Sequence, residues 1–148
     1  MTPVWVLVST GQNALRENGG LREPGGRSPL WIWMHILVAH DDRGFLASLA
    51  TTLRSVGHKV TACDNAMSAW DDLNRNSINL LVTRLQFPYP QPDGVALALK
   101  ARSIEHDLRV LFIEAAEFRS HAGGLGTYLT SPVSVAQVMD AVAKAPTN

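Results

Sequence analysis

Short apolar segments recur along residues 36–130 and alternate with segments of a different pattern. In several of them, such as Ile36–Ala39 and Leu80–Val82, the apolar residues are consecutive, which is typical of strands buried on both faces. The pattern predicts strands over residues 36–39, 58–63, 79–84, 108–114 and 127–130.

Between and after these strands, apolar residues recur at spacings of three and four, which predicts amphipathic helices. The first predicted helix ends at Gly57 and buries Phe45, Leu46, Leu49, Leu53 and Val56. The second begins at an Asp64 or Asn65 cap and buries Met67, Trp70 and Leu73. A third covers residues 95–104, and the last buries Val135, Val138, Met139 and Val142.

Strands that alternate with helices need crossover connections, which are right-handed and give a parallel sheet covered on both faces. The sequence therefore predicts an α/β fold of the flavodoxin-like type, a three-layer sandwich around a five-stranded parallel sheet. The predicted domain covers residues 35–145, and residues 146–148 form a tail that should fray.

Residues 1–34 precede this domain and have a different composition, rich in glycine between residues 10 and 28. They are expected to be a flexible or arm-like extension. Two interpretations remain open. Either the extension packs on its own domain or on a neighbour, or Met34 is the biological start of the protein.

The composition excludes several classes of partner. Thirteen basic and thirteen acidic side chains give a net charge of zero, which favours neither nucleic acid nor an anionic membrane and leaves self-association open. The longest apolar run is about ten residues, whereas a membrane span needs about 20. The single cysteine, Cys63, cannot form a disulfide within the chain, so a cytoplasmic location is expected.

Motifs of common enzymes are missing from the sequence, including the nucleophile elbow, the Walker loop and the zinc-binding HExxH pattern. We therefore expect neither an enzyme nor a bound cofactor.

The order of several segments resembles the receiver domain of bacterial response regulators. Residues 36–42 resemble its first strand and acidic turn, residues 80–94 its phosphoacceptor strand and loop, and residues 128–132 its last strand and following proline. The resemblance implies a phosphorylation site of five residues: two Mg²⁺-binding acids, an acceptor Asp, a Thr or Ser, and a Lys. In this chain the equivalent positions are His40 and Asp41 (with Asp42 beside them), Arg84, Glu114 and Ser131.

Only one of these five positions keeps the family's residue type. An acyl phosphate forms on a carboxylate, and Arg84 has none. A permanent cation there would also repel Mg²⁺. The sequence thus predicts a degenerate receiver that does not take up phosphate. A metal site made of His40, Asp41, Asp42 and Glu114 is a weaker alternative.

Arg84 has two interpretations. It either forms ion pairs with Asp41, Asp42 and Glu114 at the ends of neighbouring strands, or extends into solvent beside unrelated acids. Tyr128 matches a family position whose ring moves on activation, and without a phosphorylation trigger it is expected to be fixed and partly buried.

Two further segments depart from the family pattern. Residues 115–126 are shorter than usual and contain three glycines, so the fourth helix is predicted to be short or absent. The loop at residues 88–92 holds three prolines and is either a rigid connector or a docking point. Candidate interaction residues are Tyr89, Trp31, Trp33 and Pro132.

The predicted function is a phosphorylation-independent interaction module of two-component signalling. Its partner would be a histidine kinase, another regulator or a second copy in a homodimer. The alternative is a small-molecule sensor that uses the cleft at the carboxyl ends of the strands.

Overall fold

The computed structural model describes residues 33–144. The predicted tail lies outside these residues, and so does the predicted extension, with Trp31, except for its last two residues, 33 and 34. The strands are β2 (His35–Ala39), β3 (Lys59–Cys63), β4 (Leu80–Thr83), β5 (Arg109–Glu114) and β6 (Thr127–Thr130). The helices are α1 (Arg43–Ser55), α2 (Ala66–Arg75), α3 (Gly94–Ile104), the 3₁₀ helix η2 (Ala116–Ala122) and α4 (Val135–Ala143). These elements confirm the predicted order of strands and helices.

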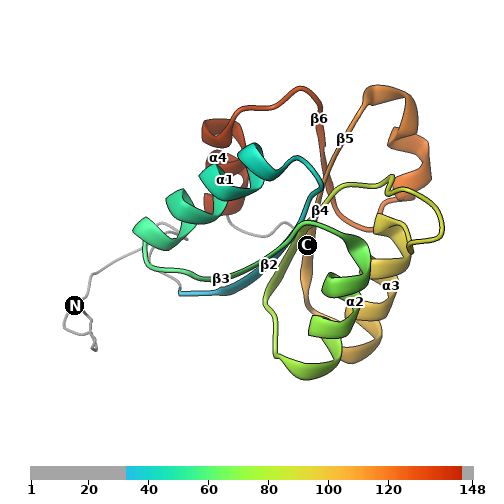
Figure 1. Cartoon of the computed structure of the whole chain (residues 1–148), viewed down its shortest axis with the longest axis horizontal. Helices are drawn as coiled ribbons and strands as arrows, with labels where there is room; N and C mark the ends of the chain where they lie inside the picture. Colours follow the sequence, from blue (N-terminus) through green and yellow to red (C-terminus); the bar gives the residue numbers. More distant parts are fainter. Residues whose placement is uncertain (1–32, 145–148) are drawn as a thin grey trace. The chain divides into compact units, whose positions relative to one another are not determined.

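The five strands form one parallel sheet in the order β3-β2-β4-β5-β6 (Figure 1). Helices α1 and α4 cover one face of the sheet, and α2 and α3 cover the other. The predicted three-layer flavodoxin-like sandwich is therefore confirmed. The chain moves from β2 outward to β3 and then back past β2 to β4, so the strand order reverses beside β2.

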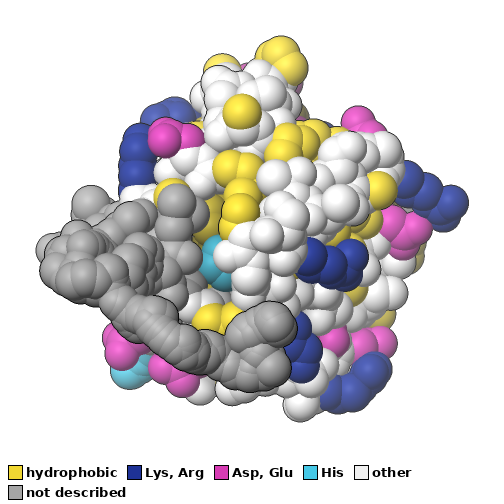
Figure 2. Space-filling model, turned by 90° about the vertical axis from the view of Figure 1, so that its left-hand side faces the viewer, with side chains coloured by type: hydrophobic (Ala, Val, Ile, Leu, Met, Phe, Trp, Pro, Cys, Tyr) yellow, Lys and Arg dark blue, Asp and Glu magenta, His cyan; other side chains and the backbone are white. Residues whose placement is uncertain are grey.

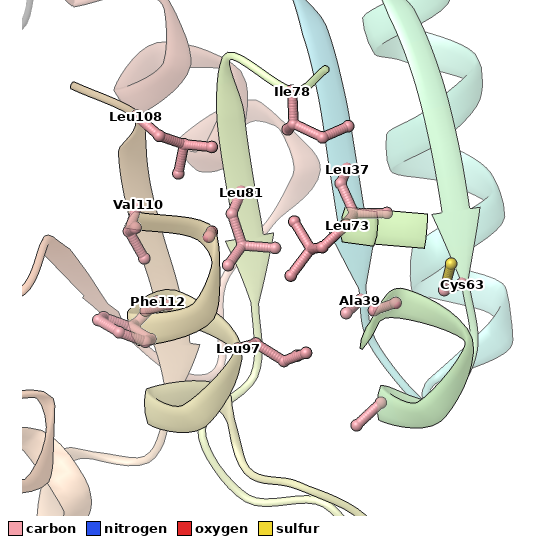
Figure 3. Packing of buried hydrophobic residues seen from close by; sticks show 14 of the residues in the cluster. Leu37, Ala39, Cys63, Leu73, Ile78, Leu81, Leu97, Leu108, Val110 and Phe112 are labelled. Carbon is pink, nitrogen blue, oxygen red and sulfur yellow. The ribbon is translucent and has the colours of Figure 1, made fainter. Parts of the chain in front are cut away.

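Each central strand sends alternate side chains to opposite faces, because successive strand residues point in opposite directions. Ile36 and Val38 of β2 pack with α1 and α4, whereas Leu37 and Ala39 pack with α2 and α3. Figure 3 shows the second of these clusters, in which Leu81 lies among the labelled residues of the neighbouring strands and α3. Both faces are apolar, which explains the consecutive apolar residues in the sequence.

Two residues assigned to buried helix faces are exposed. Met67 of α2 is 49% exposed and Val56, just after α1, is 42% exposed. In α2 the fully buried positions are Ala66 and Ala69, whose small side chains bring the helix close to the sheet. Trp70 is only partly buried, and the Lys100 ammonium lies 4.5 Å from its ring centroid.

The segment expected to lack a full fourth helix forms η2. The helix is capped at its C-terminal end by Gly123, which has a left-handed backbone conformation that glycine adopts without strain. The prediction of a short fourth helix is confirmed.

Gly94 allows α3 to begin directly against the strand end that carries Arg84. A β-carbon at Gly94 would lie 2.0 Å from the Arg84 carbonyl oxygen. Gly94→Ala is therefore expected to lower the free energy of unfolding by roughly 2 kcal/mol or more, measured by urea denaturation. Gly44→Ala, whose nearest contact would be 3.6 Å away, is the matched control in α1. The control should be neutral or slightly stabilising, and equal effects of the two substitutions would contradict this packing.

Figure 2 shows the side of the molecule on which α1 and α4 lie in Figure 1. Among the described residues, basic and acidic side chains are interspersed on this face, and hydrophobic side chains gather between them. None of the helices within residues 33–144 is long and apolar enough to span a membrane.

Candidate functional site

The carboxyl ends of β2, β4 and β5 lie side by side and bring three predicted site residues together. Ala39 at the end of β2 pairs with Thr83 of β4, and Thr83 pairs with Phe112 of β5. The next residues along these strands and their loops place Asp41, Arg84 and Glu114 at one edge of the sheet. Ligands of open α/β sheets bind at this edge, where the strand order reverses.

Arg84 forms ion pairs with two of the predicted acids. Its Nε and Nη2 atoms donate to the two carboxylate oxygens of Glu114 at 3.1 and 2.6 Å. Its Nη1 atom donates to Asp41 Oδ1 at 2.9 Å. The ion-pair interpretation is therefore confirmed for Glu114 and Asp41, and the interpretation with a solvent-directed Arg84 is wrong. The hydrogen bonds to Glu114 raise the pKa of Arg84 above its ordinary value.

Glu114 is the centre of this cluster, because it is only 3% exposed and accepts backbone hydrogen bonds as well. Its Oε1 accepts from the amides of Leu85 and Gln86 at 3.2 and 3.0 Å, and its Oε2 accepts from the Ala115 amide at 3.3 Å. Burial alone would raise the pKa of Glu114. Hydrogen bonds from Arg84 and the backbone outweigh burial and lower the pKa, so the carboxylate is ionised.

Asp42 does not join the ion pairs, so the prediction that it faces Arg84 is wrong. Its Oδ1 accepts from the Phe45 amide at 3.1 Å and forms the N-cap of α1. A carboxylate at this position satisfies an amide that has no partner within the helix. Capping therefore takes the side chain away from the strand ends.

His40 supports the β2–α1 turn as a hydrogen-bond acceptor. Its Nδ1 accepts from the Asp42 amide at 3.0 Å, and its ring packs against Phe45. Burial and the nearby Arg84 cation lower the pKa of His40, which favours the neutral ring that this hydrogen bond requires. Nδ1 of His40 is also 3.9 Å from Asp41 Oδ1, but a nitrogen that accepts from the Asp42 amide has no proton to donate to this carboxylate.

Ser131 and Pro132 follow β6 at the same edge. The Ser131 amide donates to the Glu114 carbonyl at 2.8 Å, which ties the end of β6 to the end of β5. The Tyr128 hydroxyl donates to the Ala115 carbonyl, and the Arg119 guanidinium lies 5.0 Å from the Tyr128 ring centroid. Tyr128 is thus held inward and partly buried, as expected.

The candidate interaction residues Tyr89 and Trp33 are exposed, at 96% and 62% respectively. The loop of Tyr89 is anchored by Gln91, whose side-chain oxygen accepts from the Ala66 amide at 2.6 Å. The backbone amide of Gln91 also donates a hydrogen bond to the Pro88 carbonyl at 3.0 Å. These contacts fix the loop on the first turn of α2 and support the interpretation of a rigid connector.

The residues at the strand ends do not fit a divalent cation. Between Asp41 and Glu114 lies the Arg84 guanidinium, a fixed positive charge where Mg²⁺ would need oxygen ligands. Within residues 33–144, no group of three or more His, Cys, Asp or Glu side chains is placed to hold a metal ion.

Three contributors to the cluster were missed from the sequence, namely the backbone amides of Leu85, Gln86 and Ala115. Backbone donors carry no residue signature. The available signal was Glu114 itself, because a carboxylate at the end of a buried strand needs several donors to remain charged.

Comparison with known proteins gives concordant results, although no family model matches the chain. The response regulator receiver protein CpdR of Brucella abortus is 37% identical over 78 residues, which cover 53% of this chain and 63% of that protein. The DNA-binding transcriptional regulator NtrC of Azospirillum brasilense is 27% identical over 115 residues, which cover 74% of this chain and 24% of that protein. The match therefore spans less than two thirds of either curated relative.

Among solved structures, a response regulator receiver protein from Sinorhizobium medicae is 31% identical. It superposes with a TM-score of 0.66 over 74% of this chain and 91% of that structure. Identity, coverage and fold thus agree with the resemblance seen in the sequence. The chain belongs to the response regulator receiver family of two-component signalling.

Proposed function

We propose that this receiver is a pseudo-receiver that works without phosphorylation, as a protein-interaction module. The observation that carries the proposal is the two-point contact between Arg84 and Glu114 at the strand ends. Arg84 places a cation at the position where the family has an acceptor carboxylate. This cation binds the buried carboxylate of Glu114.

Chemistry at these atoms supports the proposal. An acyl phosphate requires a carboxylate oxygen that is open to attack. Arg84 offers no such oxygen, and both oxygens of Glu114 accept hydrogen bonds at 3% overall exposure. We assign no catalytic role to the remaining residues of the site, and we infer that the protein is not an enzyme.

The partner that we infer is another signalling protein, either a histidine kinase or a regulator, or a second copy of this chain. Membership in the receiver family supports the first choice. The zero net charge of the chain gives little repulsion between copies and supports the second. Sensing of a small molecule at the strand ends stays a prediction, and we rank it second because Arg84 and its two carboxylate partners lie where such a ligand would enter.

The test combines a phosphoryl donor with a phosphate mimic. After incubation with acetyl phosphate and Mg²⁺, intact-mass spectrometry should show no added phosphoryl group. Mg²⁺ with beryllium fluoride should leave the melting temperature unchanged. The Thermotoga maritima response regulator TrrA, whose structure holds Mg²⁺ and BeF, is the positive control for the assay with the phosphate mimic.

A phosphoryl adduct, or a rise in melting temperature with the mimic, would overturn the proposal. Once a partner is found, its affinity should be the same before and after phosphatase treatment of this protein. Loss of binding after that treatment would also count against phosphorylation-independent action.

A further inference from the structure

A continuous series of contacts leads from Arg84 to the surface around Tyr128. Glu114 Oε2 accepts from Arg84 Nη2 at 2.6 Å and also from the Ala115 amide at 3.3 Å. The Ala115 carbonyl, which belongs to the following peptide group, accepts a hydrogen bond from the Tyr128 hydroxyl. One residue, Ala115, therefore joins the ion pair to the phenol.

Ala115 also determines where η2 begins. Its carbonyl accepts from the Phe118 amide at 3.1 Å and so closes the first turn of η2. Arg119 of the same helix lies over the Tyr128 ring, at a distance typical of a cation–π contact. Tyr128 is consequently held at two points, by its hydroxyl on Ala115 and by its ring under Arg119.

The charge of Glu114 decides whether this series stays intact. A carboxylate with both oxygens as acceptors can serve Arg84 and the backbone amides together, whereas a protonated carboxyl has one hydroxyl that must donate. Glu114 is buried, and burial disfavours its charged form unless a cation lies beside it. Arg84 supplies that cation from within the chain.

We propose that the Arg84–Glu114 ion pair keeps Tyr128 docked against Ala115 and Arg119, so that β6 and η2 present one fixed surface. This inference rests on the proposed function, in which the permanent charge of Arg84 takes the place of reversible phosphorylation. A partner that binds this surface would always find Tyr128 in the docked position. Any change that separates Arg84 from Glu114 would release Tyr128.

The test uses tyrosine as a local probe, because the chain has only two tyrosines. Tyr89→Phe leaves Tyr128 as the single tyrosine, which is labelled as 3-fluorotyrosine and followed by ¹⁹F NMR. The Tyr128→Phe protein gives the reference signal of a solvent-exposed ring, since Tyr89 is 96% exposed. Purified protein without any phosphoryl donor is used, so this experiment can fail while the phosphorylation test succeeds.

In the Tyr89→Phe background, Arg84→Met and Glu114→Gln should each shift the Tyr128 signal toward the exposed reference or add a second signal. Arg43→Met is the matched control, because Arg43 pairs with Asp64 at 3.0 Å on an exposed part of α1. The control should leave the Tyr128 signal unchanged. A folded Arg84→Met protein with an unchanged signal would overturn the proposal.

A reciprocal measurement covers the case in which those variants fail to fold. Coupling between two sites acts equally in both directions. Tyr128→Phe removes only one hydroxyl, and it should increase the hydrogen-exchange rate of Arg84 Nε–H several-fold relative to Tyr89→Phe. Equal exchange rates in the two proteins would overturn the proposal.

Discussion

Glu114→Ala is expected to lower the free energy of unfolding by about 3–5 kcal/mol, the range for removing one partner of a buried ion pair. The Glu114 side chain is 4% exposed and accepts from Arg84 and from three backbone amides. Alanine would leave these donors without an acceptor and would leave Arg84 paired only with Asp41. Urea denaturation at neutral pH measures the change.

An exposed ion pair in the same protein provides the control for Glu114. Asp140 pairs with Lys144 at 3.4 Å on the surface of α4, and Asp140→Ala should cost about 0.5 kcal/mol or less. The double variant Arg84→Met with Glu114→Leu should recover part of the lost stability, because it removes both charges while the three backbone amides still lack their acceptor. If Glu114→Ala costs no more than Asp140→Ala, the ion pair does not hold the strand ends together.

Acidification is expected to destabilise the protein by up to about 3 kcal/mol through His58 alone, between about pH 7 and pH 4. His58 is 5% exposed, and its Nδ1 accepts from the Met34 amide at 3.2 Å. Burial lowers the pKa of His58 from 6.5 to about 4. The unfolded chain therefore binds the proton first, so the stability from neutral His58 is full above pH 6.5 and is lost as the pH falls toward 4.

The measurement for His58 is the free energy of unfolding as a function of pH. His58→Asn keeps an acceptor near the position of Nδ1 but cannot titrate, so its stability should fall less steeply between pH 6.5 and 4. His106→Asn, at an exposed position after α3, should keep the slope of the parent protein. Identical slopes for the parent and His58→Asn would contradict the prediction.

The strands could be predicted from the sequence because their apolar runs are continuous and both faces of the sheet are covered. The helices were predicted less well in their detail. Periodicity places Met67 on the inner face of α2, but Ala66 and Ala69 occupy that face because only small side chains fit at this distance from the sheet. The prediction that Val56 is buried is wrong for another reason. Helix α1 ends before Val56, so its side chain no longer follows the buried face of the helix.

The core of the candidate site could also be predicted, because parallel strands end at one edge and the residues just beyond them must meet. This rule places Arg84, Asp41 and Glu114 together, and their hydrogen bonds confirm it. The rule fails for Asp42, where the need to cap α1 is stronger than attraction to Arg84. Backbone amides around Glu114 depend on loop geometry, which residue types alone do not determine.

The buried position of Glu114 constrains how this receiver can evolve. Arg84→Asp alone would place a second carboxylate beside Glu114 and remove the cation that neutralises it, so at least one of the two acids would become protonated. A carboxylate at position 84 would therefore require a second change at position 114, and either change made alone removes one partner of a buried ion pair and lowers stability. The two positions are therefore coupled in sequence space, because a single substitution at either one is costly unless the other changes with it.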